Sequence, residues 1–112
     1  MMILRAGDKV RIIKDAFENN EYDIVVIATR GSIGKVLSYG EYCDYLKKGS
    51  GGSKEHLLYI KEGMDGGIQY PIRLVEVVTP PKGFYDDWDE PVNMACKVRR
   101  VCFLSAEFFE KL

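Results

Sequence analysis

The chain has no apolar run approaching the roughly 20 residues that cross a bilayer, and it is poor in cysteine, histidine and tryptophan. Residues 1–5 hold too short an apolar run for a secretory signal, so we expect neither export nor membrane insertion. The three cysteines lack a Cys-x-x-Cys spacing, which fits reduced, buried thiols better than a disulfide framework. We therefore expect a cytoplasmic protein that does not contact a membrane.

The sequence also lacks an excess of either charge. It has 16 basic and 17 acidic side chains and a net charge of −1. A dedicated nucleic-acid-binding protein usually carries a basic excess that meets the phosphates. A protein partner is therefore expected before a nucleic acid. With 112 residues, an ordinary apolar content and no internal repeat, we expect residues 1–112 to form one domain.

Catalytic and metal-binding patterns are missing as well. The sole histidine, His56, has no carboxylate or nucleophile patterned around it, so no catalytic role is predicted. Cys43, Cys96 and Cys102 could join His56 as zinc ligands, but their spacings match no zinc finger or ribbon. The sequence therefore predicts a protein that is not an enzyme and that needs neither metal nor cofactor.

Residues 28–36 resemble a phosphate-binding loop because they contain the pair Gly34-Lys35. Such a loop needs a glycine five positions before that pair and a serine or threonine after it. Thr29 and Val36 occupy these two positions. We therefore interpret the segment as a turn over residues 29–32 followed by a bent strand.

Short apolar segments with β-branched residues and glycine-rich boundaries predict a mainly β protein. A turn at Gly7-Asp8 precedes the first expected strand. Gly34 is expected to form a bulge or bend, and Pro71 to mark a sheet edge or a bulge. The expected strands are 8–13, 24–27, 33–39, 68–78 with Ile68, Tyr70, Ile72 and Leu74 on one face, and 97–103.

Helical patterns are fewer and shorter. Residues 41–48 combine apolar residues at helical spacing with acid early and base late, which predicts a helix. Ser105 is expected to cap a final helical turn over 106–112. Residues 14–23 are expected to form a loop with one helical turn near 15–18. The segment 56–60 fits a strand or a helix, and 49–53 reads as a flexible loop tip.

Three motifs together resemble the SH3-like barrel group, which includes KOW-type modules and small photosynthetic accessory subunits. They are GDKVRI at 7–12, GSIGKVLSY at 31–39, and a last strand that runs into a short turn at 104–109. The resemblance implies a small barrel closed by that turn. Residues 40–67 and 80–97 are longer than such a barrel needs, so we expect a loop and short-helix insertion at 41–67.

Acidic and aromatic residues gather in two expected loops, and we predict that they bind another protein. Tryptophan and tyrosine offer large rigid contact areas, and the surrounding acids would favour a basic partner. A solvated acidic loop folded over the barrel is the alternative, and the loop lacks the ligand pattern of a calcium-binding EF-hand. The predicted partner-binding residues are Phe17, Tyr22, Tyr85, Asp86, Asp87 and Trp88.

Two other functions stay open on the sequence. A KOW-type module could bind nucleic-acid phosphates through Arg73, Lys97, Arg99 and Arg100, if the strands that carry them pair. A solvated face of the sheet is the plainer interpretation of the same cluster. A small regulatory subunit of an enzyme is the third possibility, and no sequence motif points to it.

Overall fold

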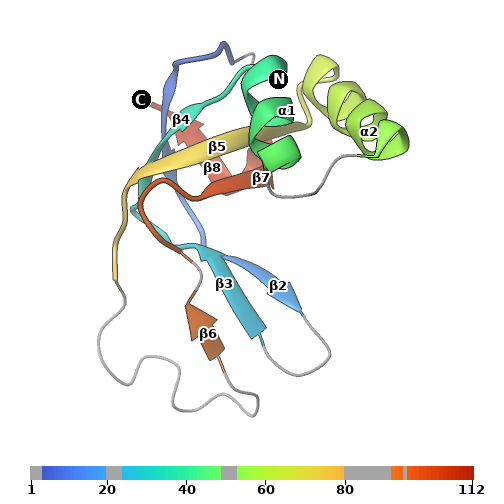
Figure 1. Ribbon diagram of the computed structural model, residues 1–112. Helices are drawn as coiled ribbons and strands as arrows, with labels where there is room; N and C mark the ends of the chain where they lie inside the picture. The colour runs from blue at the N-terminus through green and yellow to red at the C-terminus, as the bar shows by residue number, and fades with distance from the viewer. Residues whose placement is uncertain (1–3, 20–23, 49–52, 80–91, 95) are drawn as a thin grey trace.

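The computed structural model describes residues 4–19, 24–48, 53–79, 92–94 and 96–112 (Figure 1). This part of the chain is mainly β, as the sequence predicts, and it contains no helix long and apolar enough to span a membrane. The elements are β1 Lys9–Ile12, β2 Ala16–Asn19, β3 Ile24–Ala28, β4 Ile33–Val36, α1 Tyr39–Lys48, α2 Lys54–Asp65, β5 Gln69–Glu76, β6 Val92–Met94, β7 Val101–Ser105, the 3₁₀ turn η1 Ala106–Phe108 and β8 Phe109–Lys111.

Five strands form a curled antiparallel sheet in the order β7-β5-β4-β1-β8. In β1, Val10 and Ile12 are buried and Arg11 is exposed, which confirms the predicted alternation. This order places β1 beside β8, although they are the first and last strands in the sequence. Just beyond β8, the N–H of Leu112 donates to the carbonyl of Lys9 at 2.9 Å.

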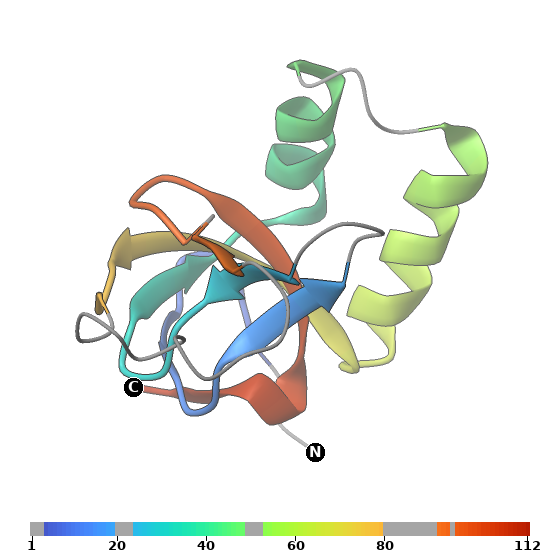
Figure 2. The same cartoon turned by 90° about the horizontal axis from the view of Figure 1, so that it is seen from below.

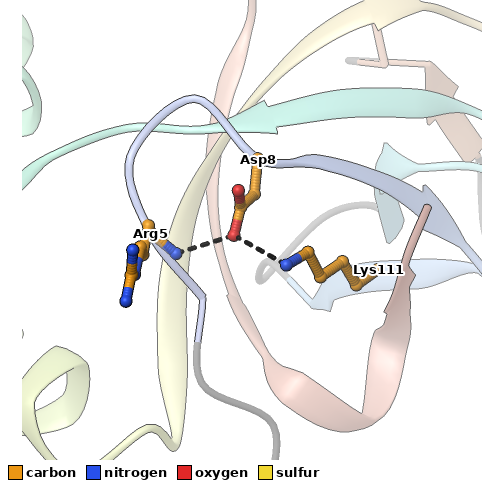
Figure 3. Close-up of polar contacts among 3 residues, drawn as sticks. All are labelled: Arg5, Asp8 and Lys111. Atoms are coloured by element: carbon orange, nitrogen blue, oxygen red, sulfur yellow. Dashed lines mark hydrogen bonds and ion pairs between the residues drawn. The ribbon is translucent and has the colours of Figure 1, made fainter.

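The turn before β1 is fixed by Asp8 (Figure 3). The Asp8 carboxylate accepts a hydrogen bond from the N–H of Arg5 at 2.8 Å, and its Oδ2 lies 3.6 Å from Lys111 Nζ on β8. Gly7 supplies the positive φ of 91° that a side chain would disfavour. The predicted Gly7-Asp8 turn is confirmed, and one carboxylate links it to the end of the chain.

Gly34 lies at an irregularity between β4 and β5, as the sequence predicts. The register shifts between Ile33, opposite Glu76, and Gly34, opposite Leu74. A Cβ built at position 34 would collide with Cγ2 of Ile72, and it would lie 3.1 Å from the carbonyl oxygen of Arg73. The bulge therefore brings the backbone of β4 so close to β5 that only glycine fits.

A second, three-stranded sheet has the order β2-β3-β6, with β2 antiparallel and β6 parallel to β3. The helical turn predicted near 15–18 is wrong, because residues 16–19 pair along β3 as a strand and bury Ala16. The predicted turn at 29–32 is confirmed. The N–H of Ser32 donates to the carbonyl of Thr29 at 3.1 Å, and Gly31 has a φ of 91°.

The five-stranded sheet carries apolar side chains on both faces. One face packs with β2 and β3 around the larger core, where Tyr70 of β5 meets Phe109 of β8 edge-on at 6.2 Å between ring centroids. The opposite face packs against the helices in a second cluster that includes Leu37, Ile60 and Val101. Figure 1 shows α1 and α2 on one side of β5 and β7, and the three-stranded sheet on the other.

Both helices lie in the segment predicted as an insertion, and they project beyond the sheets (Figure 2). The predicted helix 41–48 is confirmed as α1, which begins at Tyr39 and so ends the expected strand 33–39 at Val36. The ambiguous segment 56–60 is helical. Its helix α2 is capped by Ser53, whose Oγ accepts from the N–H of His56 at 3.2 Å.

Two expectations about β5 are wrong. Ile68 is 64% exposed, because it precedes the strand and its N–H donates to the carbonyl of Gly63 at the end of α2. Pro71 is neither at an edge nor at a bulge, since β5 lies between β4 and β7. Its missing N–H faces Leu37, just beyond β4, whose own N–H donates to the Pro71 carbonyl at 2.9 Å. Proline there removes one hydrogen bond at the margin of the sheet.

The end of the chain differs from the expectation in two ways. Residues 97–100 form a turn rather than the start of a strand, and β7 begins at Val101. The Ser105 side chain makes no cap hydrogen bond, and the helical turn is limited to η1. Residues 109–111 form β8 instead of helix because Phe109 packs into the core while pairing with Ile12.

The close approach at Gly34 makes a testable prediction. Gly34→Ala should lower the free energy of unfolding by about 1–3 kcal/mol, because the new methyl group must displace Ile72 or open the β4–β5 ladder. Gly40→Ala is the matched control, since Gly40 lies in α1 with open space around it, and it should be neutral or slightly stabilising. Denaturant unfolding compares the two variants, and equal midpoints would contradict the argument.

Candidate functional site

The predicted partner-binding residues fall into two groups. Tyr22, Tyr85, Asp86, Asp87 and Trp88 lie outside the described residues, so their role stays a prediction. Phe17 lies on β2 with 41% of its surface exposed. It borders a groove, and this groove is the candidate functional site.

The groove has a volume of about 360 Å³ and runs along β7. Two elements flank it: α1 on one side, and the β2–β3 hairpin on the other (Figure 1). Its lining combines rings, aliphatic side chains and one charge of each sign, and it consists of Phe17, Glu18, Ile27, Tyr42, Arg100, Val101, Cys102 and Phe103.

Stacked aromatic rings form the α1 side of the groove. Tyr42 stacks on Phe103 with 5.6 Å between the ring centroids and 23° between the planes, and on Tyr45 at 6.3 Å and 17°. Burial, followed by the neighbouring Tyr45, raises the pKa of Tyr42 above its ordinary value.

β7 is the edge strand beside this groove, and its side chains are apolar on both faces. Val101 and Phe103 belong to the cluster under the helices, whereas Cys102 and Leu104 belong to the larger core. Edge strands of soluble proteins are usually protected by charged side chains or proline, which discourage pairing with another strand. β7 has neither protection within its five residues.

The backbone of β7 alternates between bonded and outward-facing residues. Hydrogen bonds from Leu74 N–H to Arg100 O (2.9 Å) and from Ala106 N–H to Ile68 O (2.9 Å) fix the ladder with β5. By this alternation the backbone N–H and C=O groups of Cys102 and Leu104 point toward β5. The N–H groups of residues 101, 103 and 105 point away from it. Within the described part of the chain, β7 pairs with β5 alone.

The four cations predicted to bind phosphates do not share one site. The strands that carry them do pair, with Arg73 opposite Val101. Arg73, however, lines a separate hollow of about 220 Å³ with Glu41 and Asp44. Hydrogen bonds from the backbone and side chain of Ser38 lower the pKa of Glu41, and the charge of Arg73 adds to this effect. Arg73 therefore faces fixed negative charge, which a nucleic acid would have to displace.

The other three cations lie at the start of β7. Lys97, Arg99 and Arg100 are exposed on the turn before the strand, and Arg100 borders the groove. Arg99 has a φ of 76°, and its N–H donates to the carbonyl of Leu74 at 2.8 Å, which anchors the turn to β5. No ion pair joins any of the three to another described residue.

The histidine and two of the three cysteines do not line the groove. His56 is exposed near the start of α2, and the three thiols are buried as predicted. Among the described residues, no group of three or more histidine, cysteine and acidic side chains could hold a metal ion. Cys102 lines the groove only from within the core, where burial raises the pKa of its thiol to about 12.

A buried pair of hydroxyl groups, Thr29 and Ser32, holds the chain just after β5. No pattern in the sequence predicted this pair. Thr29 Oγ1 donates to the carbonyl of Val78 at 2.6 Å and lies 2.7 Å from Ser32 Oγ. Ser32 Oγ accepts from the N–H of Val78 at 3.0 Å. Each hydroxyl thus bonds the backbone of Val78, which gives the pair a structural role rather than that of an activated nucleophile.

Sequence analysis also missed most of the groove. Tyr42 and Phe103 were assigned to separate elements, and nothing in the sequence shows that their rings stack. A signal for β7 was present in the run Val-Cys-Phe-Leu at 101–104, since an edge strand is seldom apolar at every position. Comparison of the chain with models of protein families, with curated proteins and with solved structures finds no match.

The raised pKa of Cys102 predicts a dependence on pH. The thiol's ordinary value is 9.0 and its folded value about 12, so its contribution to stability is complete below pH 9 and is lost as the pH rises toward 12. The free-energy difference between wild type and Cys102→Ala should shrink by about 1.4 kcal/mol per pH unit above about pH 9. Denaturant unfolding at several alkaline pH values measures it, and a constant difference would contradict the assignment.

Proposed function

We propose that this chain is a small SH3-like barrel that binds another protein and is not itself an enzyme. The three motifs that resemble that group support the barrel, because they coincide with a turn, a bend and a strand pairing in the curled five-stranded sheet. Residues 7–12 form the turn and β1, Gly34 bends β4, and the last strands are joined by η1, after which β8 pairs with β1.

The observation that carries the binding proposal is the groove beside the edge strand β7. It places three aromatic rings, Phe17, Tyr42 and Phe103, around a hollow beside the edge of β7, which pairs only with β5 in the described part of the chain. Aromatic side chains are enriched at the energetically dominant positions of protein interfaces. The groove also contains Phe17, the one predicted partner-binding residue that the structure describes.

Substitution of Phe17 tests this function. Affinity capture from an extract of the native host should recover a partner with wild type, and Phe17→Ala should lower the partner's affinity about tenfold or more. Ile13→Ala is the matched control, because Ile13 has the same 41% exposure and does not line the groove. The double variant Tyr85→Ala, Trp88→Ala tests the predicted loop residues in the same assay.

All three variants must first show the circular dichroism spectrum and unfolding midpoint of a folded protein. A folded Phe17→Ala variant that recovers every partner at wild-type affinity would contradict the proposal. Recovery of nucleic acid in place of protein, with loss on addition of salt, would favour the alternative that rests on the basic residues.

A further inference from the structure

We propose that the groove takes an extended, acidic segment of the partner, which pairs with β7 as an additional strand of the five-stranded sheet. This inference rests on the proposed function, and it adds the conformation and the charge of the bound segment. Three independent features of the described residues carry it.

The first feature is the backbone of β7. The alternation fixed by the ladder with β5 leaves the N–H groups of residues 101, 103 and 105 and the carbonyls of 101 and 103 directed into the groove side of the strand. An added strand satisfies such groups with main-chain hydrogen bonds and gains affinity from them. β7 therefore offers a template for one more strand.

The second feature is the pair of walls. Successive side chains of an extended segment point to opposite sides. On one side of β7 they would meet Tyr42 and Phe103, and on the other side Phe17 and Ile27. Both walls carry aromatic or aliphatic side chains, so a segment with apolar residues at consecutive positions would bury side chains on each side.

The third feature is charge. Lys97, Arg99 and Arg100 are exposed at the N-terminal end of β7, and the groove's lining adds one acid, Glu18. Acidic residues in the bound segment would meet this excess of cations, which also accelerates association. The basic partner expected from the sequence was inferred from Asp86 and Asp87, which lie outside the described residues.

The recess favours one segment over a second copy of the chain. Among the described residues, α1 and the β2–β3 hairpin stand on either side of the edge of β7, and a copy that offered its own β7 would have to bring the same flanking elements close to them. A single extended segment has no such flanks.

Proline at position 105 tests strand pairing directly. Ser105 has a φ of −61°, which proline adopts without strain. The N–H of Ser105 points away from β5. Ser105→Pro therefore removes a hydrogen-bond donor from the outer edge of β7 and keeps the hydrogen bonds between β7 and β5. Ser105→Ala is the matched control, because it removes the hydroxyl group and keeps the N–H.

The probe is a set of short peptides selected from a random displayed library on the wild-type chain. We expect the selected peptides to be acidic with consecutive apolar residues, to bind more weakly at high salt, and to lose about tenfold in affinity for Ser105→Pro but not for Ser105→Ala. Amide exchange should slow at residues 101 and 103 when a peptide binds.

Several results would overturn the inference. Among them are the absence of selected peptides, selection of basic or proline-rich peptides, and equal affinity for the two folded Ser105 variants. A wild-type dimer in sedimentation that Ser105→Pro makes monomeric would assign the edge to a second copy instead. If Phe17→Ala abolishes partner capture while Ser105→Pro leaves it intact, the groove still binds a protein, and strand pairing alone is wrong.

Discussion

The fold depends on one constraint: the strand β7 carries apolar side chains on both faces, and both faces must be covered. Val101 and Phe103 need cover on one side of the sheet, and Cys102 and Leu104 need it on the other. The helices α1 and α2 supply the first cover and the β2–β3 hairpin supplies the second. Because burial of apolar surface is the main driving force of folding, these additions to the five-stranded sheet are required by its sequence.

Among the described residues, the two covers lie on either side of β7 and leave its outer edge unpaired, and this geometry produces the candidate site. The groove lies between them and is lined from both sides by aromatic and aliphatic side chains, with Glu18 and Arg100 as its two charged residues. The cations of the turn before β7 give one end a positive charge. The proposed binding site is therefore a junction between elements far apart in the sequence, with β2, α1 and β7 each contributing one ring.

The sequence predicted what depends on local pattern. Alternation in β1, the bulge at Gly34, the helix α1 and the turns at Gly7 and Gly31 follow from spacing and backbone preference. The strands β2 and β8 were missed because their pairing partners, not their own propensities, determine them. Phe17 was predicted as a binding residue, but its neighbours in the groove are brought together by packing between distant elements, which no local pattern records.

The most direct test of this account is hydrogen exchange of individual backbone amides in the free protein, measured by NMR. We expect slow exchange at Cys102 and Leu104, whose N–H groups face β5, and fast exchange at Val101, Phe103 and Ser105, whose N–H groups face away from it. Equal protection of all five amides would contradict it, because the edge of β7 would then already be paired within the chain.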